Sequence, residues 1–227
     1  MSKLPPNACR LRVQYIKDGR LAYLGHLEVM STVMRSIRRA GLPFEVGNGF
    51  AHRMRIQFNQ ALPVGASSAA EYFDLLLSEP IDAEAALADL KAASPKGLAP
   101  RKAEILPRRI PALEAWANLA VWEIEIREPG LDAERFMEAA ERIREIGSID
   151  FMRGDKPRHL ELAPTLVSVA ATTVEGGVDV EMRTRSGEGG SLRPQIFIEA
   201  ALGVRPLRVC RVAQYHEEAD GTLTAPL

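Results

Sequence analysis

Residues 9–40, CRLRVQYIKDGRLAYLGHLEVMSTVMRSIRRA, contain the strand-then-helix pattern on which the rest of the chain is built. Between Cys9 and Ile16 polar and apolar residues alternate, which predicts a half-buried strand that ends at Asp18-Gly19. From His26 to Ala40 apolar residues recur every three or four positions, which predicts an amphipathic helix. The rest of this half continues with strands over 54–58 and 70–78, a helix over 82–91 and a strand over 97–106.

The second half repeats this order. Its expected elements are a strand over 115–127, a helix over 131–146, an extended stretch over 149–162, a hairpin over 166–174 and 178–185 that turns at Gly176-Gly177, a helix over 194–202 and a strand over 207–214. The sequence therefore predicts an α+β fold of two tandem ferredoxin-like (βαββαβ) units packed together, with antiparallel sheets. We expect one unit over residues 1–110 and the other over 111–227, with a disordered tail after His216.

Composition places the chain among ordinary globular proteins, since 46% of its 227 residues are hydrophobic and 26% are charged. No apolar run approaches the roughly 20 residues that span a bilayer, and residues 1–7 lack a signal-peptide pattern. Cys9 and Cys210 are too few for a disulfide framework, and they show no metal-ligand spacing. We therefore expect a cytoplasmic protein with no membrane association, no metal and no cofactor.

The net charge of −1 hides an asymmetry between the halves. Residues 1–110 contain 16 Lys and Arg against 10 Asp and Glu, whereas residues 111–227 contain 13 against 20. A basic first half favours an anionic ligand for that half. A chance division of charge, or docking of two complementary halves, remains the alternative.

The segment 47–55, GNGFAHRMR, is the strongest candidate for a binding site. An aromatic among basic residues is what single-stranded nucleic acid requires, because the ring stacks on a base while the cations meet phosphates. An ordinary flexible loop with its phenylalanine in the core is the alternative. The expected RNA-binding residues of this segment are Asn48, Phe50, His52, Arg53 and Arg55.

Weaker candidates lie elsewhere in the chain. The helix arginines Arg35, Arg38 and Arg39 could contact phosphates or simply face water. In the second half, Lys156 and Arg158 lie in a basic loop, and Arg193 follows a glycine-rich loop; each loop could cradle phosphate or be a simple connection.

Two histidines are weak catalytic candidates. His26 opens the first helix and His52 lies in the segment 47–55, and either could act as a general acid or base. A buried histidine that bonds a nearby carbonyl explains His26 equally well. Catalytic residues are therefore left open.

The sequence resembles a bacterial family of unknown function, the radical SAM-associated (radical SAM-linked) proteins. The resemblance covers most of residues 9–215, and its most specific part is the first 80 residues. Its motifs are Arg10–Tyr15, Leu21–Glu28, Arg38–Pro43, Gly49-Phe50, Ala61–Gly65 with Glu71-Tyr72, and Ser191–Pro194. After Gly49-Phe50 the family pattern runs through Asn-Pro-His-Pro, whereas this chain lacks both prolines and its histidine, His52, is displaced by one position.

The resemblance implies a partner, a radical SAM enzyme with a cobalamin-type domain. This chain has no Cys-x-x-x-Cys-x-x-Cys motif to hold an iron–sulfur cluster, so the resemblance implies the accessory half of such a system. The leading hypothesis is a non-catalytic module that binds RNA or presents a substrate to that enzyme, with tRNA or rRNA modification or processing as the process it would serve. The alternatives are an RNA-modifying enzyme or ribonuclease in its own right, and a protein-binding adaptor.

Overall fold

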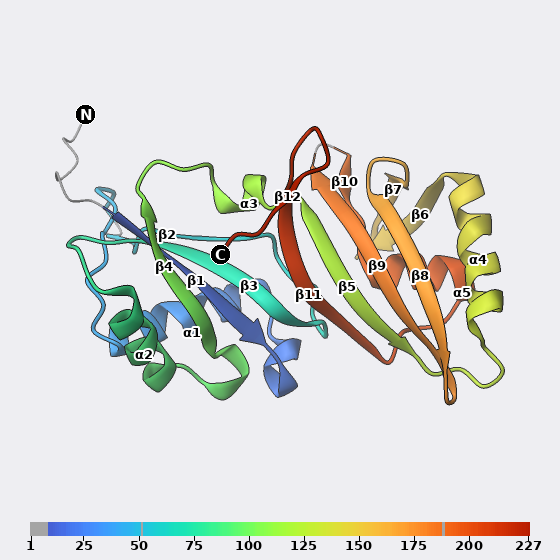
Figure 1. The fold of residues 1–227 in the computed structure, drawn as a ribbon, viewed down its shortest axis with the longest axis horizontal. Coiled ribbons are helices and arrows are strands. Elements are labelled where there is room, and N and C mark those ends of the chain that lie inside the picture. The colour runs from blue at the N-terminus through green and yellow to red at the C-terminus, as the bar shows by residue number, and fades with distance from the viewer. Residues whose placement is uncertain (1–8, 51, 188) are drawn as a thin grey trace. The chain divides into compact units, whose positions relative to one another are not determined.

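The computed structural model describes residues 9–50, 52–187 and 189–227, which form two compact units (Figure 1). The first unit runs to Ala117 and also includes Ala225–Leu227; the second comprises Asn118–Thr224. The division lies seven residues beyond the expected boundary at 110/111, and the chain returns to the first unit at its end. The expectation about a signal peptide concerns residues that lie outside the described ranges.

The first unit contains a four-stranded antiparallel sheet in the order β2-β3-β1-β4. The short 3₁₀ helices Gly19–Tyr23 and Lys96–Leu98 precede α1 and β4. Its main elements are β1 (Cys9–Lys17), α1 (His26–Arg39), β2 (Ile56–Phe58), β3 (Ser67–Leu76), α2 (Ala83–Ala93), β4 (Pro100–Pro107) and the single-turn α3 (Leu113–Trp116).

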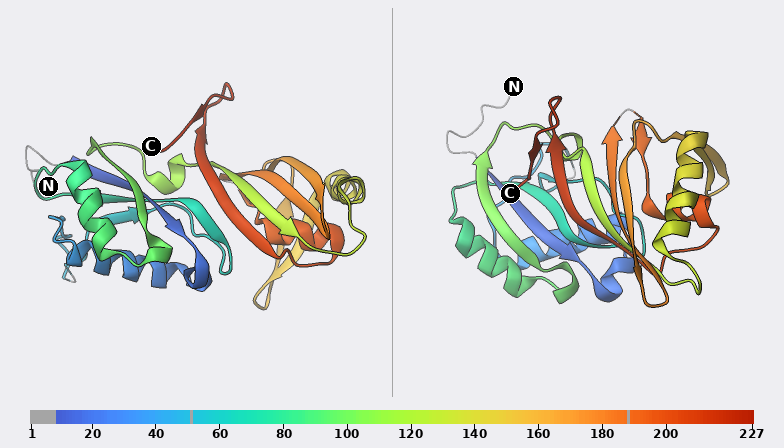
Figure 2. Two further views of the ribbon diagram at one scale, coloured as in Figure 1. Left: turned by 60° about the horizontal axis from the view of Figure 1, so that its bottom comes forward. Right: turned by 45° about the vertical axis from the view of Figure 1, so that its right-hand side comes forward.

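Capping and burial explain why the two long helices of this unit form where they do. The carboxylate of Glu28 accepts a hydrogen bond from Gly25 N at 2.7 Å, and that of Asp82 accepts one from Ala85 N at 2.8 Å. One face of α1 and one of α2 join a single apolar core with alternate residues of β1, so both helices cover the same side of the sheet (Figure 2). That core includes Leu11, Val13, Tyr15, Val33, Ile37, Phe73, Leu75 and Leu90.

The second unit also has an antiparallel sheet, in the order β8-β9-β5-β11. A hairpin of β6 and β7 forms a separate sheet, and two short strands extend the edges, β10 on β9 and β12 on β11. The elements are β5 (Leu119–Ile126), α4 (Ala133–Ile146), β6 (Ser148–Arg153), β7 (Lys156–Glu161), β8 (Leu166–Val174), β9 (Gly177–Gly187), β10 (Gly190–Ser191), α5 (Pro194–Leu202), β11 (Arg208–Glu217) and β12 (Leu223–Thr224).

The expected α+β class with antiparallel sheets is confirmed, and several boundaries differ. The strand expected from residue 115 begins at Leu119, because residues 113–116 form the helical turn α3 and Asn118 bonds the main chain of Glu217. The stretch 149–162 is a regular hairpin, with its turn at Gly154. The hairpin of β8 and β9 turns one residue earlier than expected, at Glu175-Gly176.

The tail expected to be disordered is ordered, which corrects that prediction. Asp220-Gly221 makes a turn in which Glu218 N donates to Thr222 O at 2.9 Å, so that β12 pairs with the end of β11. Gly221 has a φ of 85°, which glycine adopts without strain. The turn signal Asp220-Gly221 lies in the sequence, but the paired strand β12 has only two residues, Leu223 and Thr224, which is too short for an alternating pattern.

No helix in the described parts of the chain is long and apolar enough to cross a membrane.

Candidate nucleic-acid interface

The segment 47–55 is the end of a small hairpin that is tied to β3. Gly47 N donates to Arg53 O, and Arg55 N donates to Glu45 O, both at 2.8 Å. Glu45 N in turn donates to Leu76 O at 2.8 Å, at the last residue of β3. These bonds hold both ends of the segment in register, so the side chains at its tip project from a sheet-anchored base.

The side chains expected to bind RNA here are all at the surface. Phe50 is fully exposed, with a relative accessibility of 105%, so the alternative that it belongs to the core is wrong. Asn48, His52, Arg53 and Arg55 are exposed as well. His52 has a φ of 41°, in the left-handed region that non-glycine residues seldom adopt. The structure therefore brings these five residues together on one hairpin, with an aromatic ring at its tip.

Glu45 at the base of the hairpin is neutralised mainly from outside the segment. Arg108 bonds both oxygens of Glu45, and its hydrogen bond lowers the pKa of that carboxyl. Arg55 reaches Glu45 only at 3.4 Å and keeps nearly half of its side chain exposed. The base of the hairpin thus carries two guanidinium groups against one carboxylate, which leaves a surplus of positive charge beside Arg53.

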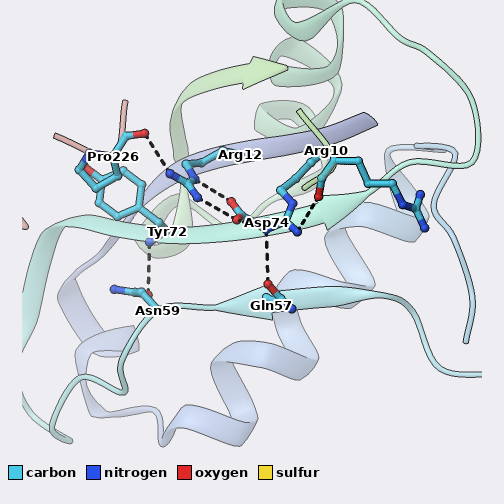
Figure 3. A network of polar contacts seen from close by, with 8 residues as sticks. Arg10, Arg12, Gln57, Asn59, Tyr72, Asp74 and Pro226 are labelled. Atoms are coloured by element: carbon cyan, nitrogen blue, oxygen red, sulfur yellow. Dashed lines mark hydrogen bonds and ion pairs between the residues drawn. The ribbon is translucent and has the colours of Figure 1, made fainter. Parts of the chain in front are cut away.

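A second polar network lies on the face of the first unit's sheet that the helices do not cover (Figure 3). Arg12 donates to both oxygens of Asp74, at 2.7 and 2.9 Å, and Arg10 donates to the same carboxylate at 2.9 Å. Arg10 also donates to Gln57 Oε1 at 3.4 Å and to the carbonyl of Arg108 at 3.0 Å. Alternation had predicted the polar side chains of this strand to be the water-facing set, yet Arg10 and Arg12 are 6% and 4% exposed.

The chain's own last residues help to close this face. Arg12 Nη1 donates to the carbonyl of Pro226 at 3.3 Å (Figure 3). The guanidinium of Arg12 also lies 5.7 Å from the ring centre of Trp116. Leu227 packs against Ala70, Tyr72 and Leu113. Sequence reasoning missed this network, because the pairing of Arg12 with Asp74 depends on the register between β1 and β3.

The three helix arginines make contacts within the first unit. Arg35 donates to Thr32 Oγ1 at 2.9 Å, and Arg39 donates to Ala93 O, at the end of α2, at 2.7 Å. The guanidinium of Arg38 lies over the ring of Phe44, 5.8 Å from its centre. All three remain exposed, so their proposed role toward phosphate stays a prediction.

The two candidate catalytic histidines have different surroundings. His26 is half-buried and meets the edge of Phe58, with ring centres 6.1 Å apart, which is a packing contact. His52 lies on the exposed hairpin tip. Within the described ranges no hydrogen bond or ion pair joins His26 to His52 or to a carboxylate, and the described His, Cys, Asp and Glu residues form no group of three that could hold a metal.

The candidates of the second unit lie near one another. Lys156 and Arg158 are exposed on β7, and Arg193 is exposed just before α5. Although Arg193 is exposed as a residue, partial desolvation of its charged group and the charge of Arg153 lower its pKa, so the guanidinium groups of Arg153 and Arg193 are electrostatic neighbours. The structure therefore adds Arg153, which belongs to the same basic loop in the sequence, to this group.

The chain is thus a two-unit α+β protein with exposed cationic hairpins. Residues 10–194 match the model of a family described as "Uncharacterized protein conserved in bacteria (DUF2344)", and the chain belongs to that family. The expected membership of a bacterial family of unknown function is therefore confirmed, whereas the link to radical SAM enzymes stays a prediction. No curated protein matches the chain.

Two solved structures are similar to the chain at low identity. One is an unknown protein from Galdieria sulphuraria, with 11% identity over 79% of this chain and 81% of the other, and a TM-score of 0.25. The other contains the first two RRM domains of the yeast poly(U) binding protein, with 13% identity over 88% of this chain and 96% of the other, and a TM-score of 0.22.

Proposed function

We propose that this chain is a non-catalytic, cytoplasmic accessory protein that binds RNA, or presents an RNA substrate, to a radical SAM enzyme with a cobalamin-type domain. Its two units would be tandem ferredoxin-like domains, with the β6–β7 hairpin inserted into the second. The strand orders support this, since β2-β3-β1-β4 and β8-β9-β5-β11 correspond element by element. Such a scaffold leaves binding to the loops and hairpins that it carries.

The observation that carries the proposal is the exposure of Phe50 at the tip of an anchored hairpin. A phenylalanine in water gains none of the free energy that burial would give it, so full exposure of this ring on a hairpin with an anchored base favours a binding role. Arg53 and Arg55, exposed on the same hairpin, add positive charge, and Asn48 and His52 add hydrogen-bonding groups. An aromatic ring beside guanidinium groups matches a base and its phosphates.

The radical SAM partnership is supported by the sequence motifs alone. The order of the stretches from Arg10–Tyr15 to Ser191–Pro194 resembles radical SAM-linked proteins, and the chain lacks a cysteine motif for a cluster of its own. An accessory role fits the surroundings of His26, which packs against Phe58 rather than facing a carboxylate.

A titration with total tRNA and with rRNA fragments, followed by fluorescence anisotropy at several salt concentrations, tests RNA binding. Stacking contributes roughly 1–3 kcal/mol per base, so Phe50→Ala is expected to weaken binding by roughly 5- to 150-fold. Arg53→Ala and Arg55→Ala are each expected to reduce the salt slope by about 0.7. Arg20→Ala, on an exposed arginine of the same unit, is the matched control and should leave both values unchanged.

Failure to bind RNA at low salt, or equal binding by Phe50→Ala and wild type, would overturn the RNA-binding proposal. The partner is tested separately, by affinity capture from an extract of the bacterium that produces the protein. Recovery of an enzyme with both a radical SAM cluster motif and a cobalamin-type domain is expected. Capture of other proteins only would favour the adaptor alternative.

A further inference from the structure

The register of the β6–β7 hairpin places three cations and an aromatic ring on one face. Phe151 pairs with Arg158, and Arg153 pairs with Lys156. Directly paired residues of an antiparallel ladder share a face, and so do alternate residues along each strand. These four side chains therefore lie on the same side of the hairpin. Arg153 and Lys156 lie next to the turn at Gly154.

The same face continues toward the core of the second unit, which fixes its position. The next pair on this face of the ladder, Ile149 and Leu160, is buried, with 5% and 7% of the two residues exposed. A Cβ at Gly190 would come within 2.9 Å of Leu160 Cδ1, so the glycine-rich loop packs directly on the hairpin. This loop leads to Arg193, which brings a fourth cation beside Arg153.

None of these four cations is paired with a carboxylate among the described residues, although Asp155 lies between Arg153 and Lys156 in the sequence. None of Arg153, Lys156, Arg158 and Arg193 forms an ion pair or hydrogen bond with another described side chain. Like charges on a surface repel, so packing of the hairpin against the glycine-rich loop keeps them close at an energetic cost. A polyanion that neutralises them would remove that cost.

An aromatic ring on the same face indicates which polyanion fits. Phe151 lies directly opposite Arg158 in the ladder, so its ring and a guanidinium group are neighbours on this face. Single-stranded RNA matches such a pair, because a base stacks on the ring while its phosphates meet the cations. A hollow of about 350 Å³ at the same hairpin is not part of this site, because most of its lining residues, Asp150, Met152, Pro157 and His159, belong to the opposite face.

We infer that the face of Phe151, Arg153, Lys156 and Arg158, together with Arg193, is a second binding site, for single-stranded RNA. It holds phosphates on the cations and stacks an unpaired base on the ring of Phe151. The choice of RNA as the ligand rests on the proposed function, whereas the location of the site rests on residues of the second unit alone. It gives the otherwise acidic half of the chain its own anionic ligand.

The experiment compares wild type with the triple variant Arg153→Gln, Lys156→Gln, Arg158→Gln. The matched control, Arg135→Gln, Arg142→Gln, Arg144→Gln, removes the same charge from exposed positions of α4. The probe is a fluorescent single-stranded RNA of mixed sequence, titrated at several salt concentrations. Each lost phosphate contact reduces the salt slope by about 0.7, so the triple variant should lower it by about 2 and the control should not.

A second probe, inorganic tripolyphosphate, separates this site from the Phe50 hairpin. NMR shifts are expected at residues 151–158 and 193 in wild type and in Phe50→Ala, and not in the triple variant. RNA binding that depends on Phe50 but not on the triple substitution would overturn this inference and leave the proposed function standing. Tripolyphosphate binding without RNA binding would retain an anion site and overturn its assignment to RNA. Binding of neither probe would overturn both.

Discussion

Arg12 holds Asp74 through two parallel hydrogen bonds, from Nε to Oδ1 at 2.7 Å and from Nη2 to Oδ2 at 2.9 Å. Arg10 shares the same carboxylate, and Asp74 has no exposed surface at all. Two buried guanidinium groups therefore depend on one carboxylate, while Nε of Arg10 is buried without a partner among the described residues. The polar side of β1 is a structural element of the first unit, with a net positive charge.

Asp74→Asn should destabilise the protein strongly. The substitution keeps the shape of the side chain but leaves two buried cations without an anion, for which a loss of about 3–5 kcal/mol in the free energy of unfolding is expected. Urea denaturation followed by circular dichroism measures it. The matched control is Asp89→Asn on the exposed side of α2, which should change stability by less than about 0.5 kcal/mol. Equal effects of the two substitutions would refute the importance of the network.

The alternation in residues 9–16 was enough to predict a strand but not the burial of both its faces. The apolar set faces the helices as expected. The burial of Arg10 and Arg12 requires Asp74 to be placed opposite Arg12, and this register is set by long-range pairing between β1 and β3. A single sequence contains no local signal for that pairing. Two carboxylates, Glu71 and Asp74, in the otherwise mostly apolar run AEYFDLLL, residues 70–77, were the available hint.

The sequence was enough to predict which residues are candidates for binding, but not which of them lie next to one another in space. Basic residues around Phe50 identify the first hairpin, and the basic residues 153–158 identify the second. That Phe151 shares a face with Arg158 follows only from the β6–β7 register, since the stretch 149–162 contains no clear strand pattern. The proximity of Arg193 to Arg153 depends on how the glycine-rich loop packs on Leu160.

Two phenylalanines of the first unit should respond in opposite ways to truncation. Phe50 is fully exposed, so Phe50→Ala should leave the free energy of unfolding within about 0.5 kcal/mol of wild type. Phe58 is 7% exposed and contacts Phe73 with ring centres 5.9 Å apart, so Phe58→Ala should cost about 3–5 kcal/mol. Thermal and urea denaturation measure both. A large loss of stability in Phe50→Ala would mean that its ring packs against the protein in solution.

Removal of the last three residues should weaken the first unit. A chain ending at Thr224 loses the carbonyl that accepts from Arg12 and the side chain of Leu227 that packs on Leu113. A loss of about 1–3 kcal/mol is expected, because a buried guanidinium donor is left without its acceptor. Urea denaturation measures it, with Leu223→Ala in the exposed β12 as the control. Unchanged stability after truncation would show that residues 225–227 do not hold this face closed.

His159 should titrate at higher pH than an ordinary histidine. Hydrogen bonds to Asp150 at 2.7 Å and to Glu161 at 2.8 Å favour the protonated ring and raise its pKa above the usual value of about 6.5. Because the folded pKa is the higher one, the pair of bonds stabilises the hairpin fully below about pH 6.5, and this contribution is lost as the pH rises through the folded pKa. An NMR titration of the His159 ring measures the pKa directly. Asp150→Asn should lower it toward the ordinary value, whereas Asp155→Asn at the turn should not. A wild-type pKa at or below 6.5 would contradict the two hydrogen bonds.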